Sequence, residues 1–170
     1  KYSGLDAEST IVEDIKDENI GHNAIRRELK ISSDSVRAFV KKEGIKTSTY
    51  FISAFLFLLS KVNMDKEAII ATIHNGRSEE LKNTFGMFVR TFPLYINFEG
   101  IDDSREMLHK VNDELIHNVN NDIYSFSQVV TNLGVSPEIL FAYQGDYMFR
   151  TKFQGKEVVA EQIDEKEGKS

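Results

Sequence analysis

Two apolar runs separated by a short polar connection constrain this chain more than any other feature. The runs are residues 68–73 (AIIATI) and 85–98 (FGMFVRTFPLYINF), and Gly76-Arg77 lies between them. Both runs are rich in β-branched and aromatic residues and are bounded by Asn-Gly and Glu-Gly turns, which is typical of buried strands. The second run barely alternates, so it predicts a strand covered on both faces in the middle of an α/β sheet. Pro93 indicates an edge, a bulge or a bend there, because proline cannot donate to a ladder.

Two helices are predicted before this strand pair. The first carries an apolar stripe at positions 36–40, starts from a capping serine, Ser32 or Ser33, and ends at Gly44. The second covers residues 47–62 and is apolar on nearly every side. A helix without a polar face belongs inside a protein, so we expect this helix to be buried.

Two more helices are predicted after the strand pair, at residues 102–118 with an aspartate cap and at residues 125–133. Together the elements predict an α/β two-layer sandwich in which helices pack on a mixed sheet. Further strands are predicted at residues 23–29, 139–149 and 158–163.

Length and composition exclude several classes of protein. The 170 residues fit one domain, and the net charge of −6 argues against a nucleic-acid binder. The absence of cysteine removes disulfides, thiolate catalysis and Cys-ligated zinc. The longest apolar run, residues 50–59, is shorter than the ~20 residues that cross a bilayer. We therefore expect a cytoplasmic protein with neither a nucleic-acid nor a membrane partner.

The central segment resembles the condensation domains of nonribosomal peptide synthetases, in the superfamily of chloramphenicol acetyltransferase-like acyltransferases. That family has a strand ending in Gly-Arg and then a Gly-Met-Phe-Val-Asn-Thr-Phe-Pro-Leu segment. Here the matching text is residues 74–77 (HNGR) and 86–94 (GMFVRTFPL), with Arg90 in place of asparagine. Residues 121–127 and 136–144 are similar to later motifs of the family in shortened form.

The resemblance implies that residues 22–170 are the C-terminal lobe of a condensation domain, truncated at the C-terminus, after a polar lead-in or linker at residues 1–21. The whole domain would form amide bonds between acyl or peptidyl and aminoacyl thioesters held on carrier proteins. The chain lacks the family's His-His-x-x-x-Asp-Gly motif, so we expect the motif in a separate N-terminal lobe and no activity from this chain alone. The chain itself would bind no cofactor, because the phosphopantetheine arms belong to the carrier domains. An isolated lobe should also expose the face that meets its partner, so we expect it to self-associate.

The resemblance also implies which residues line the substrate tunnel: His74, Gly76, Arg77, Gly86, Met87, Phe88 and Thr91. For Arg77, a structural ion pair with an acidic residue is favoured over contact with a ligand. For His74, a structural hydrogen bond is favoured over acid–base work. His109, Asp113 and His117 lie at helical spacing and could hold a metal, but a solvated helix face is the favoured interpretation.

Two other functions are compatible with the same residues. One is a stand-alone acyltransferase of the superfamily that uses coenzyme A or a carrier protein. The other is a non-catalytic interaction module, in which the shortened motifs reflect lost activity. The sequence that precedes this segment in its gene distinguishes them, because an intact catalytic motif and flanking carrier domains favour the synthetase.

Overall fold

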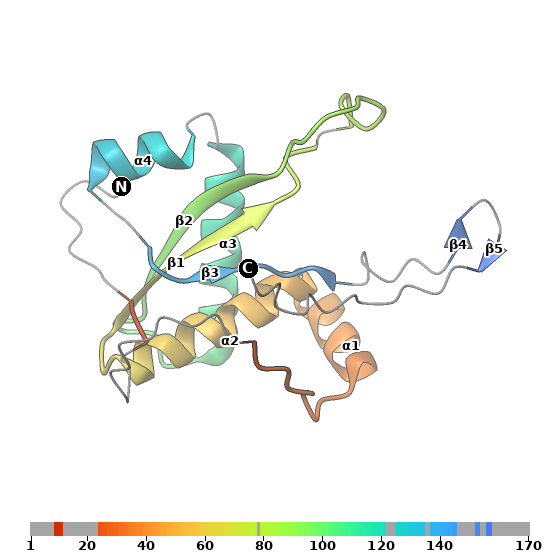
Figure 1. Cartoon of the computed structure of the whole chain (residues 1–170). Helices are drawn as coiled ribbons and strands as arrows, with labels where there is room; N and C mark the ends of the chain where they lie inside the picture. Colours follow the sequence, from red (N-terminus) through yellow and green to blue (C-terminus); the bar gives the residue numbers. More distant parts are fainter. Residues whose placement is uncertain are drawn as a thin grey trace, which may run out of the picture.

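A mixed sheet with strand order β2-β1-β3 forms the centre of the fold (Figure 1). The computed structural model describes residues 9–11, 24–77, 79–121, 125–134, 137–145, 152–153 and 156–157. Strand β1 (Glu67–His74) pairs antiparallel with β2 (Arg90–Asn97) and parallel with β3 (Leu140–Phe141). A separate two-stranded hairpin joins β4 (Lys152–Phe153) to β5 (Lys156–Glu157). The predicted α/β class with a mixed sheet is therefore confirmed.

The main core lies between one face of the sheet and the helices α2 (Thr47–Val62) and α3 (Ser104–Asn120). Ala68 and Ile70 of β1 lie opposite Ile96 and Leu94 of β2, so these four side chains share the face that packs on the helices. The core side chains are Ile52, Leu56, Leu59, Ala68, Ile70, Leu94, Ile96 and Val111.

The strand in the middle of the sheet is β1, whose residues 68–72 are all buried. The sequence assigned the middle position to the second apolar run, and that assignment is wrong, although residues 92–94 of this run are buried in succession and are therefore covered on both faces. In the described sheet, β2 has β1 on one side only, because the strand order places β1 in the middle. The strand also starts at Arg90, and residues 85–89 belong to the connection. In that connection Phe85 and Met87 are exposed, so an apolar sequence marks a surface loop there.

Pro93 lies at the outer edge of the sheet, as its chemistry predicts. Pro93 faces Ala71, and the Phe98 amide donates to the Lys66 carbonyl oxygen at 2.6 Å, so the even-numbered residues of β2 bond to β1. The proline nitrogen consequently points away from β1, where no donor is required. Helix α3 covers this edge: Asn118 donates to the Pro93 carbonyl oxygen at 3.1 Å, and Lys110 donates to that of Asn97 at 2.7 Å.

The four predicted helices are confirmed, with bounds close to those expected. Helix α1 (Ser33–Glu43) is capped by Ser32 and ends at Gly44, which has a φ of 69°. Helix α3 is capped by Asp103, and α4 (Phe126–Leu133) starts from a capping box between Ser125 and Gln128. The capping signals predicted these ends because the side chains satisfy amides that the helix leaves unbonded.

Helix α2 differs from the expectation that it is buried all round. Its inward side chains pack in the core, but Phe57, Leu58 and Val62 are exposed along the opposite side. Within the described residues, no single helix has the length and apolar content of a membrane span. Helices α1 and α2 reach that length and composition only as a pair bent by 98°.

The predicted outer strands, unlike the central pair, are confirmed only in small part. Residues 24–29 form no strand and are exposed, because no other described segment pairs with them. Strand β3 covers two of the residues predicted at 139–149; residues 142–145 form no strand and 146–149 lie outside the described residues. The predicted strand at 158–163 also lies outside them. An alternating sequence favours a strand, but the strand forms only where a neighbouring segment has unpaired main-chain donors and acceptors.

One residue of the predicted lead-in packs against the sheet. Ser9 is buried, and its hydroxyl accepts a hydrogen bond of 2.9 Å from the Ile69 amide of β1. Most of residues 1–21 lie outside the described residues. Because the Ala71 amide donates to Ile139 at 2.8 Å, Ser9 and the segment leading into β3 satisfy neighbouring donors on the same side of β1.

Candidate functional site

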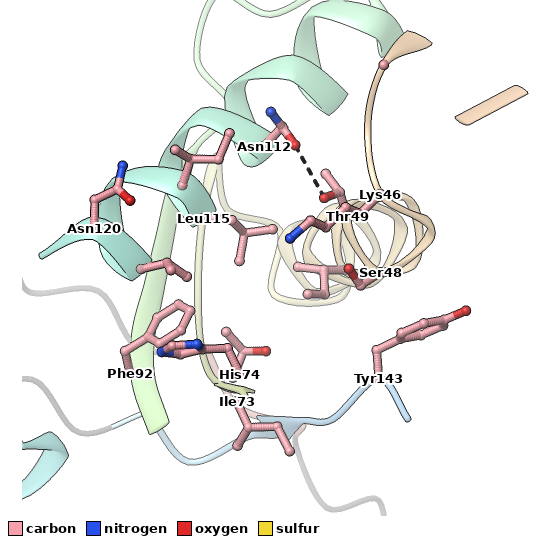
Figure 2. Close-up of a pocket in the computed structure, with 15 residues that line it drawn as sticks. Lys46, Ser48, Thr49, Ile73, His74, Phe92, Asn112, Leu115, Asn120 and Tyr143 are labelled. Atoms are coloured by element: carbon pink, nitrogen blue, oxygen red, sulfur yellow. Dashed lines mark hydrogen bonds between the residues drawn. The ribbon is translucent and has the colours of Figure 1, made fainter. Parts of the chain in front are cut away.

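A partly open cavity of about 510 Å³ lies where the first turn of α2 and the second half of α3 meet the ends of β1 and β2 (Figure 2). We call it the α2–α3 pocket. It is the continuation of the core toward the surface, because the core face of the sheet forms one of its walls. Its lining residues are Gly44, Lys46, Ser48, Thr49, Ile52, Thr72, Ile73, His74, Phe92, Asn112, Leu115, Ile116, Val119, Asn120 and Tyr143.

The polar groups of the pocket come mainly from the two helices. Thr49 is 2% exposed, and its hydroxyl donates to the Asn112 side-chain oxygen at 3.5 Å, which links α2 to α3 (Figure 2). Asn120, the last residue of α3, adds a second amide to the lining. These side chains can donate to, and accept from, an uncharged polar ligand.

The electrostatics of the pocket favour neutral or negative groups over positive ones. In the described structure, α1, α3 and α4 have capping side chains, whereas α2 starts at Lys46 without one and has no acid in its first turn. The first amides of α2 and the Lys46 ammonium therefore make this end of the pocket positive. Among the lining residues that the structure describes, none is acidic.

His74 is the predicted site residue that lines this pocket. It ends β1, and its Nδ1 accepts a hydrogen bond of 3.0 Å from the Gly76 amide. Since Nδ1 is an acceptor, the neutral ring carries its proton on Nε2. The ring also lies against Phe92, with centroids 5.6 Å apart. These contacts fix the ring orientation, as the favoured structural interpretation of His74 requires.

Arg77 organises the connection between β1 and β2. Its Nη1 donates to the carbonyl oxygens of Leu81 at 2.8 Å and Thr84 at 2.6 Å, and its Nη2 donates to that of Gly86 at 3.0 Å. We call this set the Arg77 clamp. These partners are main-chain oxygens of the same loop and not the acidic side chain of the predicted ion pair. One guanidinium can hold several carbonyls because its five donors project in a fixed plane.

Gly76 and Phe88 complete the clamp. Gly76 has a φ of 60°, and a Cβ atom at this position would collide with the Phe88 carbonyl oxygen. The guanidinium carbon of Arg77 lies 4.5 Å from the centroid of the Phe88 ring, in a cation–π contact. The glycine is therefore required by a close approach of the chain's own backbone.

The other predicted tunnel residues lie outside the pocket. Gly86, Met87 and Phe88 belong to the connection between β1 and β2, whose described residues, 75–77 and 79–89, extend away from the helices (Figure 1). Thr91 lies opposite Ile73 in the sheet register and does not line the pocket. The structure thus divides the predicted site into His74 at the pocket and a loop held by Arg77.

Sequence reasoning missed the helical side of the pocket. Asn112 and Asn120 are eight residues apart and look like part of a solvated helix face, and Thr49 looks like a helix start. The sequence held no signal of the uncapped start, because capping residue types follow directly at residues 47–49, and only the structure shows that Lys46 occupies the N-cap position.

The histidine-rich face of α3 serves a different purpose. Glu43 at the end of α1 lies 3.2 Å from the Nε of Arg105 and 3.8 Å from the Nε2 of His109, so this face ties α1 to α3. Over the described ranges, no three His, Cys, Asp or Glu side chains come together as metal ligands.

Comparisons with known proteins agree on one family. The family model of the condensation domain matches residues 12–169. Bacitracin synthase 2 of Bacillus licheniformis is 29% identical over 127 residues, which are 74% of this chain and 5% of the synthase. The FR901469 synthetase of Dothideomycetidae sp. (strain 11243) is 29% identical over 111 residues, 63% of this chain and 1% of that protein. The chain thus spans a small fraction of these relatives.

Solved structures show the same fold. A four-domain nonribosomal peptide synthetase bound to AMP and glycine superposes with a TM-score of 0.60 at 23% identity, covering 70% of this chain and 10% of that one. The first condensation domain of the calcium-dependent antibiotic synthetase, bound to a substrate analogue, gives a TM-score of 0.56 at 12% identity. In that case 65% of this chain and 25% of the other are covered.

Proposed function

Because the chain belongs to the condensation-domain family of nonribosomal peptide synthetases, we propose that it is the C-terminal lobe of such a domain and forms one wall of its substrate tunnel. The observation that carries this proposal is the Arg77 clamp. It ties the main chain of the loop to Arg77 at Leu81, Thr84 and Gly86, while Phe85 and Met87 are 104% and 91% exposed. A loop whose backbone is bonded internally and whose surface is apolar is suited to contact a second protein surface.

The second surface in this proposal is the N-terminal lobe of the same domain. In the assembled domain, the amine of an aminoacyl group attacks the carbonyl carbon of an acyl or peptidyl thioester. The new C–N bond forms as the C–S bond breaks, the amine loses a proton, and the donor carrier leaves as a free thiol. The N-terminal lobe would supply the catalytic histidine, and carrier domains would supply both phosphopantetheine arms.

His74 has a positioning role in this scheme. Its Nδ1 lone pair is used by the Gly76 amide, so the ring does not offer that nitrogen as a base. The chain contributes a shaped wall, made of the α2–α3 pocket and the clamped loop, on the side where the acceptor enters. Binding and orientation of this kind lower the barrier by holding the reacting atoms together.

Amide formation between two loaded carrier domains, followed by mass spectrometry, tests the proposal. We expect no product from the 170-residue chain alone, and product when the chain is expressed with the lobe that precedes it in its gene. In the extended protein, His74→Ala should reduce turnover without abolishing it. Turnover by the chain alone that is lost in His74→Ala would contradict the proposal and indicate a self-contained acyltransferase.

The same exposed loop leads us to propose that the isolated chain self-associates. Strand addition at the outer edge of β2 is blocked, because Pro93 lacks a donor and α3 side chains occupy the carbonyl oxygens of residues 93 and 97. The contact would therefore involve the loop. Sedimentation at micromolar concentration should show a dimer that Met87→Ser weakens, and a clean monomer would contradict this part of the proposal.

A further inference from the structure

Tyr143 lies between two cavities. On one side is the α2–α3 pocket, and on the other is a smaller cavity of about 290 Å³ beneath the start of α1. Tyr143 is the residue common to the two sets of described lining residues. The smaller cavity is lined by Leu29, Ile31, Ser33, Val36, Arg37, Thr47, Phe51 and Tyr143.

The Tyr143 side chain is 38% exposed and contacts α2 through its ring. It stacks on Phe51 of α2, with ring centroids 5.7 Å apart and planes 17° apart. The backbone that carries it follows β3, where the Thr72 hydroxyl donates to the Phe141 carbonyl oxygen at 3.0 Å. Gly145 has a φ of 55°, and a Cβ atom there would come within 3.1 Å of the Tyr143 ring. The backbone at Gly145 therefore lies beside the Tyr143 ring.

Both cavities have apolar side chains in their lining, and the Tyr143 ring lies between them. Ile52 and Ile73 line the larger cavity, and Ile31 and Val36 line the smaller one. A linear apolar group that entered the larger cavity would meet the Tyr143 ring before it could reach the smaller. Without the ring, the two spaces would form one longer slot.

We propose that Tyr143 is a specificity-determining residue that limits the length of an uncharged acyl or side-chain group bound in the α2–α3 pocket. The ligand class follows from the lining, which combines aliphatic side chains with hydroxyl and amide groups and has no acidic residue to accept a cation. This inference rests on the proposed function only in taking a thioester-linked acyl group as the ligand.

The test measures binding of N-acetylcysteamine thioesters of straight-chain acids, from butanoyl to dodecanoyl, to the 170-residue chain by titration calorimetry. Each methylene that becomes buried should tighten binding about fourfold. In the wild type, the gain should stop at the chain length that reaches Tyr143. Tyr143→Ala should move this limit to longer chains, whereas Tyr143→Phe, which keeps the ring and loses the hydroxyl, should leave it unchanged.

A second variant protects the test against loss of folding. Tyr143→Leu keeps an apolar contact with Phe51 and has a shorter side chain, so it should move the limit in the same direction as Tyr143→Ala. Methyl NMR signals of Leu115 and Ile116 should shift on binding, which places the ligand in the pocket. A limit that is the same in all four proteins, or no binding by any thioester, would overturn the inference. Because no turnover is measured, failure of amide formation in the assembled domain would not imitate either result.

Discussion

The main core and the described part of the connection between β1 and β2 (residues 75–77 and 79–89) both contain apolar side chains but are held together in different ways. In the core, Leu56, Ile70 and Leu94 are fully buried and exclude water from one another. In the loop, Phe85 and Met87 are exposed, and Arg77 binds main-chain oxygens instead. The comparison shows that an apolar sequence run can be buried in a core or exposed in a loop. Which of the two occurs depends on whether other apolar side chains pack against it. The comparison also predicts that the two regions respond differently to substitution.

The largest effect should come from truncating the core. Leu56→Ala removes a side chain that is buried among α2, β1 and β2, and should lower the free energy of unfolding by about 3 kcal/mol. Met87→Ala in the loop is the matched control and, at a concentration below that at which the chain dimerises, should change it by less than about 0.5 kcal/mol. Urea denaturation followed by circular dichroism measures both. Equal losses would mean that the loop is part of the core.

The next effect should come from Gly76 in the loop. Gly76→Ala puts a Cβ atom against the Phe88 carbonyl oxygen in a left-handed conformation, and should cost about 2–3 kcal/mol. Gly100→Ala has a similar φ of 73° with no atom near the new Cβ, and should cost about 1 kcal/mol. The same denaturation experiment compares them. If the two variants were equally stable, the close approach of Phe88 would have no energetic role.

Arg77→Lys should have a smaller and more local effect. Lysine keeps the charge but cannot reach three carbonyl oxygens from one planar group, so we expect a loss of about 1 kcal/mol. Amide hydrogen exchange should rise within residues 79–89 and stay unchanged in β1. Arg37→Lys on the surface of α1 is the control and should alter neither quantity. Exchange that increased throughout the sheet would show that the clamp stabilises the whole fold.

The smallest effect at neutral pH comes from Tyr95 in β2, which changes the free energy of unfolding only at alkaline pH. Burial, with a hydrogen bond to Glu67, raises the pKa of Tyr95 from 10.0 to about 12. The folded protein then holds this proton more tightly than the unfolded chain between about pH 10 and pH 12, so stability falls as pH rises through that range. Tyr95→Phe should remove this part of the pH dependence. Below pH 9 the variant should lose little free energy of unfolding relative to the wild type. An identical slope in both proteins between pH 10 and 12 would contradict the assignment to Tyr95.

The sequence predicted those parts of the fold that depend on local chemistry. Ser32, Asp103 and Ser125 are capping residues, and Gly44 ends α1, because the required atoms lie within a few residues along the chain. Pro93 indicated an edge position because its missing donor is a property of the residue itself. The family resemblance at residues 86–94 identified the fold as well.

The sequence failed where the answer depends on residues far apart in the chain. Residues 85–89 have strand composition, but the Arg77 clamp, which forms only when the chain turns back on itself, holds them in a loop. The pocket likewise depends on Thr49 meeting Asn112, which is 63 positions away. His74 was found because it lies next to the family motif, whereas Tyr143 gave no signal of its position between two cavities.

The Arg77 clamp has a consequence for how this loop can evolve. Leu81, Thr84 and Gly86 each contribute a main-chain oxygen to it, and every amino acid supplies that oxygen. Mutations at Leu81 and Thr84 therefore leave the acceptors in place, and those at Phe85 and Met87 change only what the loop presents. Selection on a partner surface can act on the presented side chains while Gly76 and Arg77 preserve the loop's conformation. The residues that hold the loop's conformation are therefore different from the residues that would determine which partner it binds.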